Sequence, residues 1–141
     1  RLKTAQSTRM SHYFGGRYEN IYINREESAA IKQLLALAQQ IAEQLTGHSN
    51  LQTGFWFNEM QPGHFTTAHS HDDDDEILSG VYYVSVPDNS GRLILGEGEQ
   101  RKTVQPRAGE MIFFSPALLH EVEVNRSDQT RISIAMNFGT G

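Results

Sequence analysis

The sequence contains no cysteine at all. This absence excludes disulfide bonds, thiolate zinc sites and cysteine nucleophiles, and it is typical of proteins from the reducing cytoplasm. The sequence also lacks any apolar run close to the ~20 residues that a membrane-spanning helix needs, and no signal peptide is visible. We therefore expect a cytoplasmic protein without a membrane partner.

Basic residues are also few. The 141 residues include 12 Lys and Arg against 17 Asp and Glu, which gives a formal net charge of −5 at pH 7. Because no long basic block is present, we expect no nucleic-acid partner. Four acidic residues are consecutive at 72–75. This run lacks the glycine and the terminal Glu of a calcium-binding loop, so a solvated turn is the better interpretation.

The N-terminal third predicts an arm, a short strand and one helix. Residues 1–17 are polar and contain a Gly-Gly pair, and residues 18–47 hold the strand and the helix. Asn24 and Glu27 resemble a capping box at the start of the helix, and Gly47 suits its end. The apolar residues of the helix recur three or four positions apart on one face: Ala30, Ile31, Leu34, Leu35, Ala38, Ile41, Ala42 and Leu45. Such a face is expected to cover a sheet.

After Gly47 the pattern changes to short strand-like runs separated by turn residues. The expected strands are 54–60, 65–71, 78–86, 92–95, 111–114, 120–124 and 130–138. Helices and strands do not alternate along the sequence, as they would in a protein with a parallel sheet. A β-sandwich or small barrel is therefore favoured. The sequence therefore predicts a single mainly-β domain over 1–141, with its core at 54–138 and one covering helix.

Three histidines occupy positions from which they can converge. His69 and His71 are two residues apart on an expected strand, so both imidazoles leave the same face. His120 follows about fifty residues later on another expected strand. Neutral imidazole binds iron, zinc, copper or nickel, and a carboxylate favours iron or manganese. The ligands are then either His69, His71 and His120, which the continuous face of 65–71 favours, or His71, Asp73 and His120.

Arg131 and Ser133 share one face of an expected strand whose other face is apolar. A guanidinium that faces a sheet interior is costly unless it meets an anion, and it binds carboxylates through two parallel hydrogen bonds. Ser133 can donate its hydroxyl to the same carboxylate, and Tyr83 on a separate strand can complete the pocket. The pattern predicts a carboxylate-binding site beside the histidines.

Together these residues resemble those of the 2-oxoglutarate- and Fe(II)-dependent dioxygenases, which carry a His-x-Asp/Glu motif, a distal His and a following Arg-x-Ser. The resemblance is stronger to a bacterial and phage branch with His-x-His at the first motif. It extends from about Phe55 to Phe138. The stretches that carry it are Pro62-Gly63 ahead of His69, residues 78–84, Gly109 to Phe114, His120-Glu121-Val122, and Arg131-Ile132-Ser133 with Asn137.

The resemblance implies a fold and a set of metal ligands. The fold would be a double-stranded β-helix, also called a jelly roll. His69 and His120 would bind Fe(II), and His71 would take the position that usually holds a carboxylate. The stretch between His71 and Leu78 is longer than the branch leads us to expect, which keeps Asp73 open as the second ligand.

The resemblance also implies a cofactor site and a reaction. Arg131 and Ser133, assisted by Tyr83, would hold the distal carboxylate of 2-oxoglutarate. The protein would be an Fe(II)- and 2-oxoglutarate-dependent dioxygenase that uses molecular oxygen and hydroxylates a C–H bond of a small-molecule or peptide substrate. The substrate is not identified by these residues, and a homodimer is left open.

The main alternative is a cupin-type metal-binding enzyme or small-molecule sensor. In a cupin, Glu76 would join His69, His71 and His120 as the fourth metal ligand. The glycine after Glu76 comes sooner than the cupin motif requires, and a cupin gives no reason for Arg131 and Ser133.

Overall fold

The computed structural model describes residues 9–14, 17–22, 29–69 and 76–140. Their elements are α1 (Ala29–Thr46), β1 (Arg9–Phe14), β2 (Arg17–Tyr22), β3 (Gln52–Met60), β4 (Thr66–His69), β5 (Glu76–Ser85), β6 (Leu93–Leu95), β7 (Lys102–Val104), β8 (Met111–Phe114), β9 (His120–Val122) and β10 (Arg131–Gly139), with a 3-10 turn at Gly98–Gln100. In the described part of the chain, no helix is both long and apolar enough to span a membrane.

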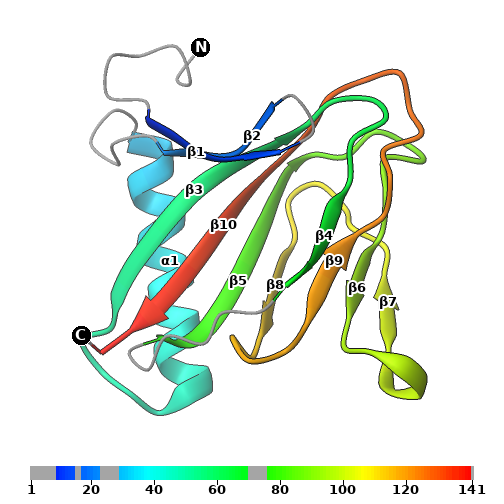
Figure 1. Cartoon of the computed structure of the whole chain (residues 1–141). Helices are drawn as coiled ribbons and strands as arrows, with labels where there is room; N and C mark the ends of the chain where they lie inside the picture. The colour runs from blue at the N-terminus through cyan, green and yellow to red at the C-terminus, as the bar shows by residue number, and fades with distance from the viewer. Residues whose placement is uncertain (1–8, 15–16, 23–28, 70–75, 141) are drawn as a thin grey trace.

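The strands form two antiparallel sheets (Figure 1). The large sheet has six strands in the order β1-β2-β3-β10-β5-β8, and the small sheet has four in the order β4-β9-β6-β7. From β3 to β10 the chain crosses repeatedly between the sheets, so that each sheet holds four of these eight strands. This arrangement is the predicted jelly roll, and β1 and β2 extend its large sheet beyond β3.

Two of the strands were not expected from the sequence. Residues 1–17 were predicted to form an arm, but Arg9–Phe14 pairs with β2 as an antiparallel hairpin. The segment does not alternate apolar and polar residues, so its backbone pairing with β2 could not be recognised from the sequence. The other strand, β7, has only three residues and lies at the edge of the small sheet.

The helix α1 packs against the large sheet through the middle of its predicted apolar face. Ile31, Leu35, Ala38 and Ala42 are buried at a spacing of three or four residues, whereas Ala30 and Leu45 at the two ends are exposed. The proposed cap residues Asn24 and Glu27 lie outside the described residues. The predicted end is confirmed, because Gly47 adopts a φ of 75° and its N–H donates to the carbonyl of Glu43.

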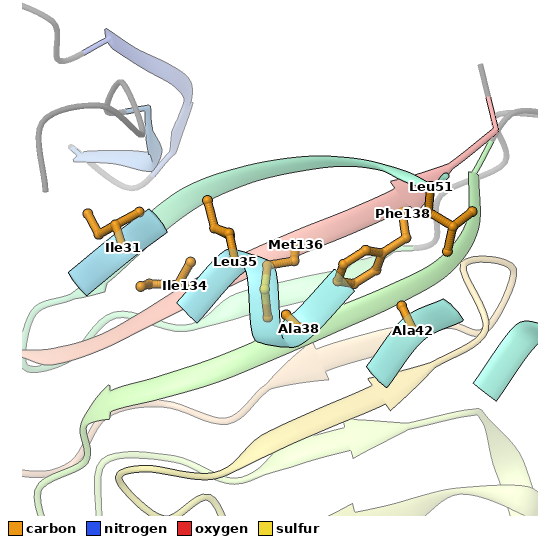
Figure 2. Close-up of a cluster of buried hydrophobic side chains, with 8 residues drawn as sticks. All are labelled: Ile31, Leu35, Ala38, Ala42, Leu51, Ile134, Met136 and Phe138. Carbon is orange, nitrogen blue, oxygen red and sulfur yellow. The ribbon is translucent and has the colours of Figure 1, made fainter. Parts of the chain in front are cut away.

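The hydrophobic core lies between α1 and one face of the large sheet (Figure 2). From the sheet, alternate residues of β10 contribute Ile134, Met136 and Phe138, all of them buried. Leu51, at the connection between α1 and β3, closes one end of this cluster. Since α1 covers this face, the other face of the large sheet is the one that lies toward the small sheet.

Polar side chains fasten the end of α1 to the start of β3. The carboxylate of Glu43 accepts a hydrogen bond from the backbone N–H of Leu51 at 3.0 Å. The hydroxyl of Thr53 donates to the side-chain oxygen of Gln39 at 3.2 Å. These contacts set the helix in register with β3 and leave the opposite face of the sheet available for a site.

Candidate active site

The strand β10 separates core residues from site residues by simple alternation. Arg131 and Ser133 are buried on the face of the large sheet opposite to the helix-facing Ile134 and Met136. The sequence analysis placed these two pairs on opposite faces, and the structure agrees. A charged and a hydroxyl side chain are thus held in the space between the two sheets.

Two of the predicted metal-binding positions lie side by side. His69 in β4 and His120 in β9 are direct Cα partners of the antiparallel pair. Nothing is described of the side chain of His69, and His71 and Asp73 lie outside the described residues altogether. The structure therefore brings two of the three histidine positions together, and the choice between His71 and Asp73 stays a prediction.

The ring of His120 faces the large sheet. Its centroid lies 5.0 Å from that of Phe114 in β8, so an aromatic contact joins the two sheets at this point. Its Nδ1 lies 3.2 Å from the carbonyl oxygen of Leu118. In the tautomer whose Nδ1 donates to this carbonyl, Nε2 carries the lone pair that a metal ion requires.

The side chains within the described residues do not include three that could together hold a metal ion. This result is expected for the predicted set, because of its members only the side chain of His120 is described. The chemistry of the predicted donors fits iron: two or three neutral imidazoles, with a carboxylate as the alternative, suit a non-haem Fe(II) site.

The predicted cofactor-binding residues form one cluster. Ser133 and Tyr83 are cross-strand partners in β10 and β5. The guanidinium carbon of Arg131 lies 5.2 Å from the centre of the Tyr83 ring. Arg131 is 3% exposed and Tyr83 1% exposed, so both are withdrawn from bulk water.

Burial and mutual contact shift the pKa values of this pair. Burial raises the pKa of the Tyr83 phenol above its usual value, against the opposing effect of the Arg131 charge and hydrogen bond. Burial also lowers the pKa of Arg131, and Tyr83 acts in the opposite direction. The phenol is therefore a neutral hydrogen-bond donor at physiological pH, and the guanidinium, whose intrinsic pKa is very high, keeps its charge.

The charge of Arg131 has no anionic partner among the described residues. One guanidinium nitrogen, Nη1, donates to the sulfur of Met60 at 3.1 Å, and the buried Nε has no hydrogen-bond partner within the described part of the chain. An ion pair between Arg92 and Glu123 lies elsewhere and does not involve Arg131. A buried guanidinium in this condition is costly, and a bound carboxylate would remove the cost. The residues present therefore fit the distal carboxylate of 2-oxoglutarate.

A buried asparagine sets the position of Arg131 at the start of β10. The side-chain N–H groups of Asn125 donate to the carbonyls of Met60 at 3.1 Å and Gln129 at 2.9 Å. Its side-chain oxygen accepts hydrogen bonds from the backbone and hydroxyl of Ser127. These bonds tie the turn before β10 to the end of β3, so that Arg131 enters the sheet opposite Met60.

The same face of the large sheet continues with polar residues that the sequence analysis did not select as site residues. Ser79 lies four positions before Tyr83 in β5 and pairs with Asn137 in β10 and Phe114 in β8. The hydroxyl of Ser79 and the side-chain oxygen of Asn58 in β3 are buried, and neither has a hydrogen-bond partner among the residues that the structure describes. Their shared alternation with Tyr83 and Ser133 was the signal that could have identified them.

Comparison with known families identifies the chain. A family model described as the 2OG-Fe(II) oxygenase superfamily matches residues 55–139, which is more than half of the chain. The chain belongs to this superfamily. It is thus an oxidoreductase with Fe(II) and 2-oxoglutarate as cofactors, as the motif resemblance implied. This membership also sets aside the cupin alternative.

Solved structures with the same fold include two prolyl hydroxylases and an epimerase. A prolyl-4-hydroxylase from Pseudomonas putida has a TM-score of 0.71 and 24% identity, with 84% of this chain and 71% of that chain covered. A viral collagen prolyl hydroxylase from Paramecium Bursaria Chlorella virus-1, in a truncated form, has a TM-score of 0.72 and 15% identity over 87% of this chain and 76% of that one.

The third is the epimerase SnoN, solved with Fe3+, α-ketoglutarate and nogalamycin RO. It has a TM-score of 0.72 and 18% identity, and the match covers 98% of this chain and 70% of that chain. These identities are low, so the three structures support the jelly-roll fold alone. No curated protein is similar enough in sequence to match this chain.

Proposed function

We propose that this oxygenase hydroxylates a C–H bond of a small-molecule or peptide substrate and binds 2-oxoglutarate through Arg131. When bound, iron and 2-oxoglutarate supply the oxidising chemistry, in which dioxygen converts 2-oxoglutarate to succinate and carbon dioxide. The role of the protein is to bind the cofactor in a fixed position, to exclude water and to position the substrate. Hydroxylation is inferred by analogy, since two of the structures with this fold are prolyl hydroxylases.

The buried guanidinium of Arg131 is the observation that carries this proposal. It is buried, it contacts the Tyr83 ring and the Met60 sulfur, and no described carboxylate balances its charge. Arginine binds carboxylates with two parallel hydrogen bonds, and such bonds are strongest away from water. A dicarboxylic acid anchored here would extend along the sheet toward the strands of His69 and His120.

Ser133 and Tyr83 would complete the carboxylate site. Their positions as cross-strand partners place both hydroxyl-bearing side chains beside Arg131. Because burial raises the pKa of Tyr83, its phenol stays protonated and can donate a hydrogen bond to the cofactor. Three donors of different shape would then select a carboxylate over a neutral group of similar size.

His69, His71 and His120 are the proposed iron ligands. The adjacency of positions 69 and 120 in β4 and β9 supports two of them. His71, two residues after His69, is favoured over Asp73 because it continues the same face of the extended segment.

The absence of cysteine favours a cytoplasmic location, and a homodimer stays open.

The central experiment adds 2-oxoglutarate to the anaerobic Fe(II)-loaded protein. We expect a weak visible charge-transfer band and, once oxygen is admitted, release of succinate. The Arg131→Met variant should need far more 2-oxoglutarate to produce the band while still binding iron. If the band fails to form in wild-type protein that demonstrably holds iron, the proposed cofactor site is wrong.

A second experiment addresses the ligand set. His71→Ala should cost more iron affinity than Asp73→Ala, with iron content measured after dialysis against a graded series of chelator concentrations. His64→Ala serves as the control, because His64 lies outside β4 and is not among the proposed ligands. The reverse order for His71 and Asp73 would move the ligand set to His71, Asp73 and His120.

A further inference from the structure

The side chain that accepts a hydrogen bond from the Arg131 guanidinium is a methionine, Met60. It is the last residue of β3, it is 1% exposed, and its Cα is the cross-strand partner of that of Arg131. Nη1 of Arg131 donates a hydrogen bond to Sδ of Met60 at 3.1 Å. The thioether therefore accepts one of its five N–H groups.

The choice of sulfur has a chemical consequence. A thioether is a weak and neutral acceptor, so it orients one N–H without neutralising the positive charge. A carboxylate in the same place would form a buried ion pair and compete directly with an incoming acid. An aliphatic side chain would fill the same space but leave the N–H without an acceptor.

Met60 is also held firmly, unlike many methionines in protein cores. Its carbonyl accepts a hydrogen bond from the side chain of Asn125, which itself is buried and bonded to the turn before β10. The backbones on both sides of the sulfur–guanidinium contact are thus fixed by one network. Such a support can define the direction of the guanidinium plane.

We propose that Met60 is a positioning residue for the cofactor: its sulfur orients Arg131 and leaves the whole guanidinium charge to the distal carboxylate of 2-oxoglutarate. This inference rests on the proposed role of Arg131. It goes further by naming the neutral acceptor that prepares the arginine before the acid arrives. Binding of 2-oxoglutarate should then depend on the acceptor at position 60 more than on its volume.

Three substitutions at position 60 separate acceptor strength from volume. Met60→Leu keeps an apolar side chain and removes the acceptor, so the Kd for 2-oxoglutarate should rise about three- to tenfold. Met60→Gln has the same unbranched length with an amide oxygen as acceptor, and its Kd should stay within about threefold of wild type. Met60→Glu supplies a counter-ion for Arg131, and its Kd should rise by about a hundredfold or more.

Met136→Leu is the matched control. Met136 is also 1% exposed and lies in the same sheet, but it faces α1 in the hydrophobic core. The substitution has the same chemistry as Met60→Leu, so it should change thermal stability to a similar degree. It should leave the Kd for 2-oxoglutarate unchanged.

The Kd is measured by calorimetry, with 2-oxoglutarate titrated into anaerobic Mn(II)-loaded protein, and thermal melts without 2-oxoglutarate confirm that each variant is folded. Succinate release then gives KM and kcat for 2-oxoglutarate, and Met60→Leu should raise KM with little change in kcat. A purely structural role would lower the melting temperature without this separation.

The outcomes of this experiment are distinguishable. If wild-type protein does not bind 2-oxoglutarate, the proposed function itself fails. If wild-type protein binds it but Met60→Leu binds equally well, or Met60→Gln binds no better than Met60→Leu, the inference about Met60 is overturned while Arg131 keeps its role. The inference is supported if Met60→Gln binds 2-oxoglutarate nearly as well as wild type while Met60→Glu loses affinity for it.

Discussion

The two faces of the large sheet bury side chains of different kinds, apolar on one face and polar on the other. On the helix side, Ile134, Met136 and Phe138 pack against α1 as an apolar cluster (Figure 2). On the side of the small sheet, the same strand buries Arg131 and Ser133, and Nε of Arg131 has no hydrogen-bond partner among the described residues. One strand, read at alternate positions, thus serves stability on one face and ligand binding on the other.

This difference follows from how each face is completed. The apolar face is satisfied by the protein alone, since α1 removes it from water. The polar face retains a charge and several buried atoms without partners, and an unsatisfied buried group costs about 1–3 kcal/mol. A protein keeps such groups when a ligand satisfies them, which is why we place the cofactor on that face.

Phe138→Ala should give the largest effect on stability. Phe138 has no exposed surface and packs against Phe113 with ring centroids 6.0 Å apart. The substitution should lower the free energy of unfolding by about 3–5 kcal/mol, measured by urea denaturation. At a low temperature, where Phe138→Ala remains folded, it should still bind 2-oxoglutarate with near wild-type affinity. A selective loss of binding at unchanged stability would contradict the division between the two faces.

Arg131→Met should have the reverse signature. The affinity for 2-oxoglutarate should fall by about 2–5 kcal/mol, which is roughly 30-fold to a few thousandfold in Kd. Without 2-oxoglutarate, the free energy of unfolding should stay the same or rise, because a buried uncompensated charge has been removed. Urea denaturation with and without the cofactor checks both statements. A strong destabilisation of the cofactor-free variant would show that Arg131 has a structural partner.

Tyr83→Phe should weaken 2-oxoglutarate binding by about 1 kcal/mol, the usual value of one hydrogen bond. The substitution also gives a pH signature. Since the folded-state pKa of Tyr83 is raised above 10.0, its contribution to stability is complete below pH 10 and is lost as pH rises through the folded-state value. The stability of wild type relative to Tyr83→Phe should therefore fall above pH 10, measured by urea midpoints. Equal pH profiles would contradict the shifted pKa.

Glu123→Gln, at the ion pair on the small sheet, should give the smallest effect. Its carboxylate accepts hydrogen bonds from Arg92 at 2.7 Å and 2.9 Å, but the pair is exposed to solvent. The contacts lower the pKa of Glu123, so its contribution is present above pH 4.5 and is lost as pH falls through the lowered value. At pH 7 we expect Glu123→Gln to change the melting temperature only marginally, and we expect this change to vanish in high salt.

Much of the arrangement could be predicted because it depends on local patterns. The period of Ile31, Leu35, Ala38 and Ala42 predicted α1, and the alternation along β10 predicted which face carries Arg131. The strand at β2 was expected, but its hairpin partner β1 was not, because pairing with β2 stabilises it. The role of Met60 was equally hidden, since a methionine at a strand end carries no sign of its partner.

By itself, the sequence determined the residue types of the site, the strand face on which each lies, and the family. Side-chain alternation and motif spacing are local properties that can be read directly from the sequence. Only the tertiary structure decided that position 69 lies beside position 120, that Tyr83 lies against Arg131 and that a sulfur atom accepts a hydrogen bond from the guanidinium. These are contacts between strands far apart in the chain. They depend on sheet order and register, which arise only when both faces of the sheet pack at once.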